Sequence, residues 1–350
     1  MRLATTTIGA FPKPDYVPIS DWFQGPEGPD TVDPTAGYAA QLARAGAEAE
    51  ALFARAAADV IAAQIAAGID LPTDGEVRRE NYIHYHCRHL DGIDFQTLTE
   101  KALRGGAYAA ALPTITGPVR ARDRFLAHDW RVAQACTDRP VKMTMPGPMT
   151  IADTVANDHY DDEAKLGADL AAAINAELLD LAEAGCTRIQ IDEPVFARKP
   201  DAALDFGFEN LERCFAGAPA GVVRTVHMCC GYPDRLDNPD YPKADRNAYF
   251  RLADAIEASS IQAVSLEDAH RHNDLKLLER FRTTTVILGA VAVAKSRIET
   301  VDEIRERLRA ALDHIDSDRL IAAPDCGLGL LGRELAVAKL TNLCAAAHDL

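Results

Sequence analysis

The feature that most limits the fold of this chain is a regular alternation of short β-rich runs with longer helical segments. Eight such runs end in polar or glycine-rich residues: Thr5–Phe11, Ile69–Thr73, Val141–Met145, Thr187–Ile191, Val222–Met228, Ala263–Leu266, Thr285–Val291 and Leu320–Ala323. Helical patterns separate several of them, at Ala47–Ala67, Glu163–Ala184, Val301–Ile315 and Arg333–Ala347. Strands that alternate with helices favour a parallel sheet, and eight of them fit a closed barrel. We therefore predict an α/β fold, a (β/α)8 TIM barrel that forms a single domain over residues 1–350.

Two segments interrupt this alternation without the properties of an interdomain linker. Gln24–Pro34 is rich in Gly, Pro and Asp, and Gly231–Asn247 carries three prolines together with Asp and Asn. Both are predicted to be loops within the single domain. No glycine-rich dinucleotide fingerprint follows the first β-rich run, which disfavours an open nucleotide-binding sheet.

The overall charge and the apolar pattern exclude several classes of partner. The formal net charge is -16, which disfavours nucleic acid and anionic membranes because phosphate binding needs clustered Lys and Arg. No apolar run approaches the roughly 20 residues that cross a bilayer, and the first residues are typical of a strand rather than a signal peptide. The eight cysteines are scattered along the chain, which disfavours a disulfide framework. We expect a cytoplasmic protein.

Acidic, imidazole and thiol groups follow the predicted strands at their carboxyl ends, the end that forms the active face of a (β/α)8 barrel. They are found in the segments Asp74-Gly75-Glu76, Asp192-Glu193-Pro194, His227-Met228-Cys229-Cys230, Glu267-Asp268 and Asp325-Cys326. A buried carboxylate is costly unless it is paired or bound to a cation. Capping of the following helix explains any single acidic residue here, but it explains the whole set poorly.

Four of these residues form a candidate zinc site. His227 and Cys229 lie two positions apart on one strand, so their side chains point to the same face. Glu267 ends the next predicted strand and Cys326 follows the last one, whereas Cys230 points away. Zinc favours four ligands of these types. Two thiolates, a carboxylate and an imidazole make an electron-rich site, which favours activation of a bound thiol for S-alkylation over hydrolysis.

The same residues lie in motifs that resemble the catalytic half of cobalamin-independent methionine synthase. The motifs are TTTIGAFPKP near the start, DGEVRREN at 74–81, HLDG at 89–92, MPGPMTI at 145–151, IQIDEP at 189–194, VHMC at 226–229, SLED at 265–268 and APDCGL at 323–328. The resemblance covers nearly the whole chain and implies a short, single-barrel member of the family. It implies zinc held by the four residues named above. It also implies that Glu76 and Asp192, helped by the Ile8–Gly9 backbone, hold the amino group of homocysteine.

Three positions depart from the family pattern. Ala10 replaces a serine, Thr154 stands where a tryptophan that stacks on the folate ring is expected, and Ala294 stands where a proton-donating histidine is expected. The thiol-activating half is therefore retained while the donor half is changed. These departures favour a methylated corrinoid over methyltetrahydrofolate as donor, unless Lys295 or a histidine such as His270 supplies the proton.

The leading functional hypothesis is methyl transfer to homocysteine, which gives methionine. The donor is expected to be a methylfolate or a methylcorrinoid, the latter carried by a corrinoid protein. One alternative is alkyl transfer to another thiol, as in epoxyalkane:coenzyme M transferase, although Glu76 and Asp192 should repel its sulfonate. A second alternative is a non-catalytic zinc-binding barrel. Among the weaker candidates, the alternating residues Tyr82, His84 and His86 could line the mouth of a pocket, although solvated or helix-packed histidines are favoured. Trp22 and Trp130 are predicted to pack and not to hold the donor.

Overall fold

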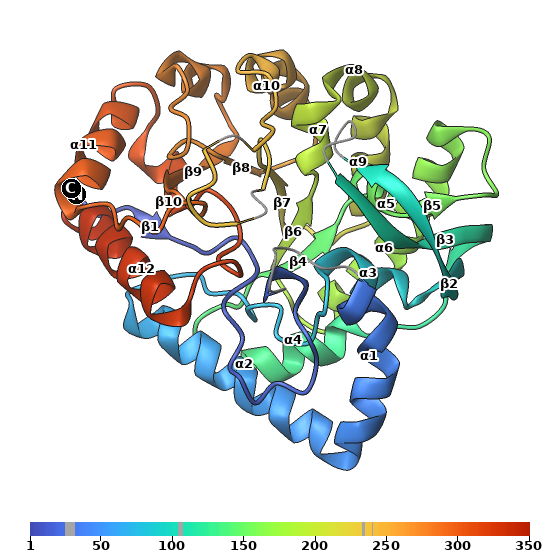
Figure 1. Cartoon of the computed structure of the whole chain (residues 1–350). Coiled ribbons are helices and arrows are strands. Elements are labelled where there is room, and N and C mark those ends of the chain that lie inside the picture. Colours follow the sequence, from blue (N-terminus) through green and yellow to red (C-terminus); the bar gives the residue numbers. More distant parts are fainter. Residues whose placement is uncertain (25–31, 104–107, 233–234, 240) are drawn as a thin grey trace.

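The computed structural model describes residues 1–24, 32–103, 108–232, 235–239 and 241–350. Its main element is a seven-stranded sheet in the order β1-β10-β9-β8-β7-β6-β4, and every neighbouring pair is parallel. The strands are β1 (Ala4–Thr5), β4 (Met143–Pro146), β6 (Arg188–Asp192), β7 (Val223–Met228), β8 (Ala263–Leu266), β9 (Thr285–Val291) and β10 (Leu320–Pro324). Figure 1 shows this sheet curled around the centre of the molecule, with helices on its outside.

Seven of the eight predicted strands are confirmed, although the first is much shorter than predicted. The predicted run Ile69–Thr73 forms only isolated parallel bridges, from Leu71 to Thr6 and from Thr73 to Lys142. Pro72 lies between these bridges and has no N–H to donate to a ladder, which disfavours a continuous strand there. The segment lies between the two ends of the seven-stranded sheet, but an eight-stranded barrel is not confirmed.

The four predicted helices are confirmed to within a few residues. They are α2 (Ala49–Ala66), α6 (Glu163–Glu183), α11 (Val301–Leu312) and α12 (Arg333–His348). The start of α11 is fixed by a capping box, in which Thr300 accepts from the Glu303 N–H and the Glu303 side chain accepts from the Thr300 N–H. The other α-helices of the described residues are α1 (Val32–Ala45), α3 (Tyr82–Cys87), α4 (Leu126–Gln134), α5 (Pro148–Thr154), α7 (Pro194–Arg198), α8 (Pro200–Ala202), α9 (Phe208–Phe215) and α10 (Ala248–Ala258).

An antiparallel hairpin beside the main sheet was not predicted from the sequence. Its strands are β2 (Leu90–Leu103) and β3 (Tyr108–Ala121), and β3 also pairs in parallel with the short strand β5 (Ala156–Asn157). Register shifts interrupt the β2–β3 ladder at two points, which weakens the alternating pattern that normally marks a strand. Leu103 and Leu112 of this hairpin are buried and face the cavity described below.

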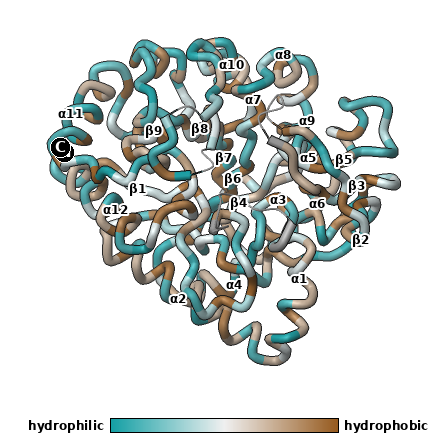
Figure 2. The backbone as a smooth tube through the Cα atoms, in the orientation of Figure 1, coloured by the Kyte–Doolittle hydropathy of each residue, from teal (hydrophilic) through white to brown (hydrophobic). Residues whose placement is uncertain are grey.

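The apolar core fills the space between the sheet and the surrounding helices. Val226, Val264 and Leu288 on adjacent strands are essentially inaccessible to solvent. Figure 2 shows hydrophobic residues along the central strands and hydrophilic ones on the outer turns of the helices. No described helix is long and apolar enough to cross a membrane.

The two predicted loops are only partly covered by the described residues. Within Gln24–Pro34, residues 25–31 lie outside them, and residues 32–34 already belong to α1, so the predicted end of this loop is wrong. The described part of Gly231–Asn247 contains neither helix nor strand and connects β7 to α10.

Candidate active site

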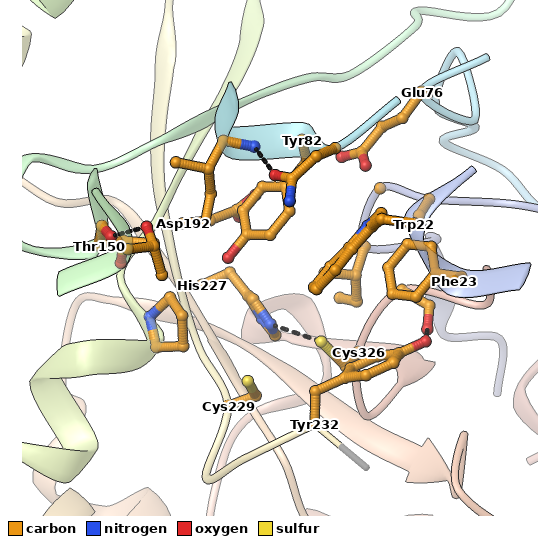
Figure 3. A pocket seen from close by; sticks show the side chains of 18 of the residues that line it. Trp22, Phe23, Glu76, Tyr82, Thr150, Asp192, His227, Cys229, Tyr232 and Cys326 are labelled. Atoms are coloured by element: carbon orange, nitrogen blue, oxygen red, sulfur yellow. Dashed lines mark hydrogen bonds between the residues drawn. The ribbon is translucent and has the colours of Figure 1, made fainter. Parts of the chain in front are cut away.

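One cavity at the carboxyl ends of the strands collects most of the predicted site residues. Its volume is about 110 Å³, and its lining draws on β6, β7, α3 and the segments that follow β1 and β10. Seven of the eight residues predicted to form the site line it: Ile8, Gly9, Glu76, Asp192, His227, Cys229 and Cys326. Figure 3 shows Cys229 and Cys326 on one side of this cavity and Glu76 on the other. A thiol site and a carboxylate site therefore face a common space of the size of a small amino acid.

The imidazole and two thiols form the group best suited to hold a metal ion. The candidate ligand atoms of His227, Cys229 and Cys326 lie within 4.8 Å of one another. His227 Nδ1 is hydrogen-bonded to Ser265 Oγ at 2.9 Å, which leaves Nε2 directed at Cys326 Sγ, 3.4 Å away. In a tetrahedral zinc site, nitrogen and sulfur ligands lie about 3.5 Å apart. This geometry fits zinc, and Ser265 orients the imidazole in the way that outer hydrogen bonds orient metal-binding histidines.

The two cysteines of this group differ in their affinity for a proton. A hydrogen bond from Cys326 lowers the pKa of Cys229 well below its usual value, and the same interaction raises that of Cys326. The shared hydrogen bond therefore favours a proton on Cys326 over a proton on Cys229. A metal that binds both sulfurs displaces the remaining proton, so we expect its affinity to rise with pH.

The structure does not bring Glu267 into this group. The Glu267 carboxylate accepts from the Cys230 N–H at 3.0 Å and forms an ion pair with Lys243. It belongs to a second cluster with His270 and Asp325. Asp325 in turn accepts three backbone N–H groups, from residues 268, 269 and 270. Three of the four predicted metal ligands therefore lie together, and the fourth lies beside them with other partners.

Glu76 reaches the cavity through an unusual backbone conformation. Its φ is 57°, in the left-handed region that few non-glycine residues adopt, and Gly75 before it has a φ of 68°. Thr144 Oγ1 donates to Glu76 Oε1 at 2.8 Å, and an Arg79 nitrogen lies 3.3 Å from the same oxygen. Burial raises the pKa of Glu76, and the Arg79 guanidinium opposes that rise. Backbone strain held by specific partners is typical of functional sites.

Gly9 is needed for the position of Glu76, because a Cβ at residue 9 would lie 2.5 Å from Glu76 Oε1. We expect Gly9→Ala to displace this carboxylate. If Glu76 holds the amino group of homocysteine, as the resemblance implies, the variant should bind homocysteine about tenfold or more weakly, the cost of a hydrogen bond to a charged group. Gly221→Ala is a matched control, since a Cβ there has nothing within 4 Å. Calorimetric titration of both variants checks this, and equal affinities would show that Glu76 has room to adjust.

Asp192 and Glu193 are adjacent in sequence but do different things. Glu193 accepts from the N–H groups of Met149 and Thr150, at 2.9 and 3.0 Å, and so caps the start of α5. Asp192 is a buried residue at the end of β6 that lines the cavity, and its Oδ1 accepts from Gln190 Nε2 at 2.7 Å. Burial raises its pKa to about 7. Glu193 therefore caps a helix, but this helix is α5 and not the following helix α7, whose start receives no side-chain hydrogen bond from Glu193.

Each of the two cavity carboxylates keeps one oxygen available. The hydrogen bonds described above engage Oε1 of Glu76 and Oδ1 of Asp192, and no described residue donates to the second oxygen of either. Burial is the main cause that raises the pKa of both groups. The charge of Asp74 also raises the pKa of Glu76, and the charge of Glu76 also raises the pKa of Asp192. A ligand with an ammonium group relieves the repulsion between these carboxylates, and the ammonium can donate a hydrogen bond to the free oxygen of each.

Aromatic residues line the cavity more extensively than the sequence indicated. Trp22, predicted to pack, lines it together with Phe23, Tyr82 and Tyr232. The ring centroids of Trp22 and Phe23 lie 4.5 Å apart, and those of Phe23 and Tyr232 lie 5.2 Å apart. Trp22 adjoins a glycine- and proline-rich segment. The residues around a tryptophan in the sequence do not show whether its ring lines a cavity or packs in the core.

Thr154 and Ala294, two of the positions that depart from the family pattern, form hydrogen bonds that limit what they can contribute to the site. Thr154 lines the cavity, but its hydroxyl donates to the Thr150 carbonyl within α5. The Ala294 N–H donates to His270 Nε2 at 2.8 Å, while His270 Nδ1 lies 2.7 Å from Asp325. Both ring nitrogens of His270 are thus occupied, and the side chain does not line the cavity. The expectation that His270 supplies a proton to the donor is not supported by this geometry.

The chain is similar to known proteins over most of its length. The model of the family described as "Cobalamin-independent synthase, Catalytic domain" matches residues 3–349. A methionine synthase of Sulfolobus acidocaldarius is 27% identical over 347 residues, 97% of this chain and 90% of that protein. One from Pyrococcus abyssi is 31% identical over 281 residues, 80% of this chain and 77% of its own length.

A solved structure is similar over nearly the whole chain. It is a B12-independent methionine synthase from Shewanella sp. W3-18-1 in complex with selenomethionine, with 31% identity and a TM-score of 0.85. The match covers 99% of this chain and 97% of that one. Methionine synthases of this kind are methyltransferases. The family is described as cobalamin-independent, so the match does not support a methylcorrinoid as donor or a corrinoid protein as partner. The chain therefore belongs to the family of cobalamin-independent methionine synthases, which it matches through their catalytic domain.

Proposed function

We propose that this protein transfers a methyl group to the thiol of homocysteine, with zinc bound by His227, Cys229 and Cys326 and with Glu267 as a further ligand. The observation that carries the proposal is that the imidazole–thiol group and the two carboxylates, Glu76 and Asp192, face one small cavity. Homocysteine has a thiol at one end and an ammonium group at the other. Selenomethionine bound to the related Shewanella protein supports a ligand of methionine shape.

In this mechanism the chain positions the acceptor and excludes water. When bound, zinc holds the substrate sulfur as a thiolate, the reactive form. The free oxygens of Glu76 and Asp192 accept from the ammonium group, with the Ile8–Gly9 backbone beside it, and so fix the sulfur relative to the donor. The aromatic wall that contains Trp22 and Phe23 keeps the cavity apolar opposite the polar groups. We also infer that residues 1–350 act as one catalytic domain.

Glu267 completes the proposed ligand set only if it exchanges partners. Its carboxylate is held by Lys243 and by the Cys230 N–H. A catalytic zinc commonly uses three protein ligands and leaves one position for substrate. With zinc bound, Glu267 would therefore be a weaker ligand than the two thiolates, and its position would be the one open to the homocysteine sulfur.

The alternatives are less well supported by the cavity. The two carboxylates should repel the sulfonate of coenzyme M, which disfavours the epoxyalkane:coenzyme M transferase reaction. A non-catalytic zinc-binding barrel gives no reason for an acceptor site of two carboxylates that faces the metal-binding group.

Methyl transfer can be tested directly with the zinc-loaded protein. We expect methionine to form from homocysteine and methyltetrahydrofolate, as measured by mass spectrometry, and no S-methyl product to form when coenzyme M replaces homocysteine. If the protein bound homocysteine tightly but formed no methionine, homocysteine would remain the proposed acceptor and methyltetrahydrofolate would be rejected as the donor. Stronger binding of coenzyme M than of homocysteine would overturn the proposal.

A further inference from the structure

A buried glutamine and a buried lysine lie directly behind the cavity, and neither was selected by the sequence analysis. Gln190 is on β6, two residues before Asp192, so both side chains lie on the same face of the strand. Lys142 immediately precedes β4, the strand that pairs with β6. Gln190 and Lys142 are 0% and 1% exposed.

Three hydrogen bonds connect these residues to the proposed acceptor site. Gln190 Nε2 donates to Asp192 Oδ1 at 2.7 Å and to the Ile8 carbonyl at 2.9 Å. Lys142 Nζ donates to Gln190 Oε1 at 2.6 Å. Ile8 lies 182 positions from Gln190 in sequence. One amide nitrogen therefore joins two of the groups that the proposed function places around the homocysteine ammonium.

The chemistry of the partners fixes the orientation of this amide. Asp192 Oδ1 and the Ile8 carbonyl oxygen are both acceptors, so a flipped amide would place a third acceptor against them. A lysine ammonium offers only donors, so Oε1 must face Lys142. Asp192 lies near enough to favour the ammonium form of Lys142, although burial lowers the pKa of that lysine to about 7.

We propose that Gln190, held by Lys142, is the positioning residue that sets the Asp192 carboxylate and the Ile8 carbonyl for recognition of the substrate's ammonium group. This inference rests on the proposed function. It gives the pair a specificity role: Gln190 uses both of its N–H bonds to hold the two acceptors, so their other lone pairs stay directed into the cavity. Loss of the amide frees Asp192 to turn and leaves the Ile8 carbonyl without its donor.

The test compares two thiols that differ only in the amino group, homocysteine and 4-mercaptobutyrate. The affinity of the zinc-loaded protein for each is measured by calorimetric titration, and the ratio of the two is the amino-group selectivity. We expect Gln190→Met, which keeps the side-chain length, to reduce this selectivity by about tenfold or more. Lys142→Met should reduce it in the same direction but less, because the amide remains and is only less firmly oriented.

A second buried lysine provides the matched control. Lys339 is 0% exposed and donates to Glu299 Oε2 at 2.8 Å, in a region formed by α12 and the segment before α11. Lys339→Met disturbs a buried lysine without contact to the cavity, so it should lower stability and leave the selectivity unchanged. Zinc content and thermal unfolding of every variant distinguish a local effect from a general one.

The outcomes separate this inference from the proposed function. A parent protein without preference for homocysteine over 4-mercaptobutyrate would overturn the ammonium site and this inference with it. A parent with strong preference, combined with unchanged selectivity in Gln190→Met, would overturn the positioning role alone. Equal loss of affinity for both thiols would also overturn it, because that result indicates general damage to the cavity.

Discussion

Cys326→Ser is expected to purify with almost no zinc, whereas the parent protein carries about one zinc per chain. A serine hydroxyl is a far poorer ligand for zinc than a thiolate, and it removes one of three ligand atoms that lie within 4.8 Å of one another. The affinity should fall by more than about 100-fold, since changes to groups that merely orient a metal ligand already cost 10–100-fold. Metal analysis and competition with a coloured chelator measure the loss.

Two further variants make this result specific. Cys230 is buried next to Cys229 but lies outside the ligand group, so Cys230→Ser should keep the zinc. Glu267→Gln should lower the zinc affinity less than Cys326→Ser does, because its carboxylate is engaged by Lys243 and the Cys230 N–H. A parent that contains no zinc after zinc-supplemented expression would rule out the metal site.

Glu76→Gln and Asp192→Asn are each expected to weaken homocysteine binding by about 10- to 100-fold while zinc content stays unchanged. Each amide keeps the shape of the side chain but removes the negative charge that pairs with the ammonium group, and a hydrogen bond to such a charged group contributes about 1.5–3 kcal/mol. The affinity for 4-mercaptobutyrate, which lacks the ammonium group, should change little. Calorimetric titration with both thiols measures the two effects.

Glu193→Gln is the matched control for this pair. Glu193 is adjacent to Asp192 and is also buried, but its oxygens accept from the N–H groups of Met149 and Thr150 and from the Thr150 hydroxyl at the start of α5. Its substitution should lower the free energy of unfolding without changing the preference for homocysteine. If Glu76→Gln and Asp192→Asn bound homocysteine as tightly as the parent, the two carboxylates would need a different role.

Much of the candidate site was predictable because it depends on short-range regularities. The two-residue spacing of His227 and Cys229 places both on one face of a strand, and polar residues at the ends of parallel strands meet at one edge. The motifs that contain Glu76, Asp192 and Cys326 gave the family. The geometry of Glu267 was not predictable, because its partner Lys243 lies in an irregular segment whose path no periodic pattern describes.

The sequence by itself determined seven strands of the main sheet, the four longest predicted helices to within a few residues, and seven of the residues that meet in the cavity. These features depend on periodicity, capping and strand-end position, all of which are local. Only the tertiary structure decided that Gly9 makes room for Glu76, that Glu193 caps α5 while Asp192 faces the cavity, and that Gln190 joins Asp192 to Ile8. Each of these depends on contact between segments far apart in the chain, and such contacts are set by strand order and side-chain packing rather than by any local pattern.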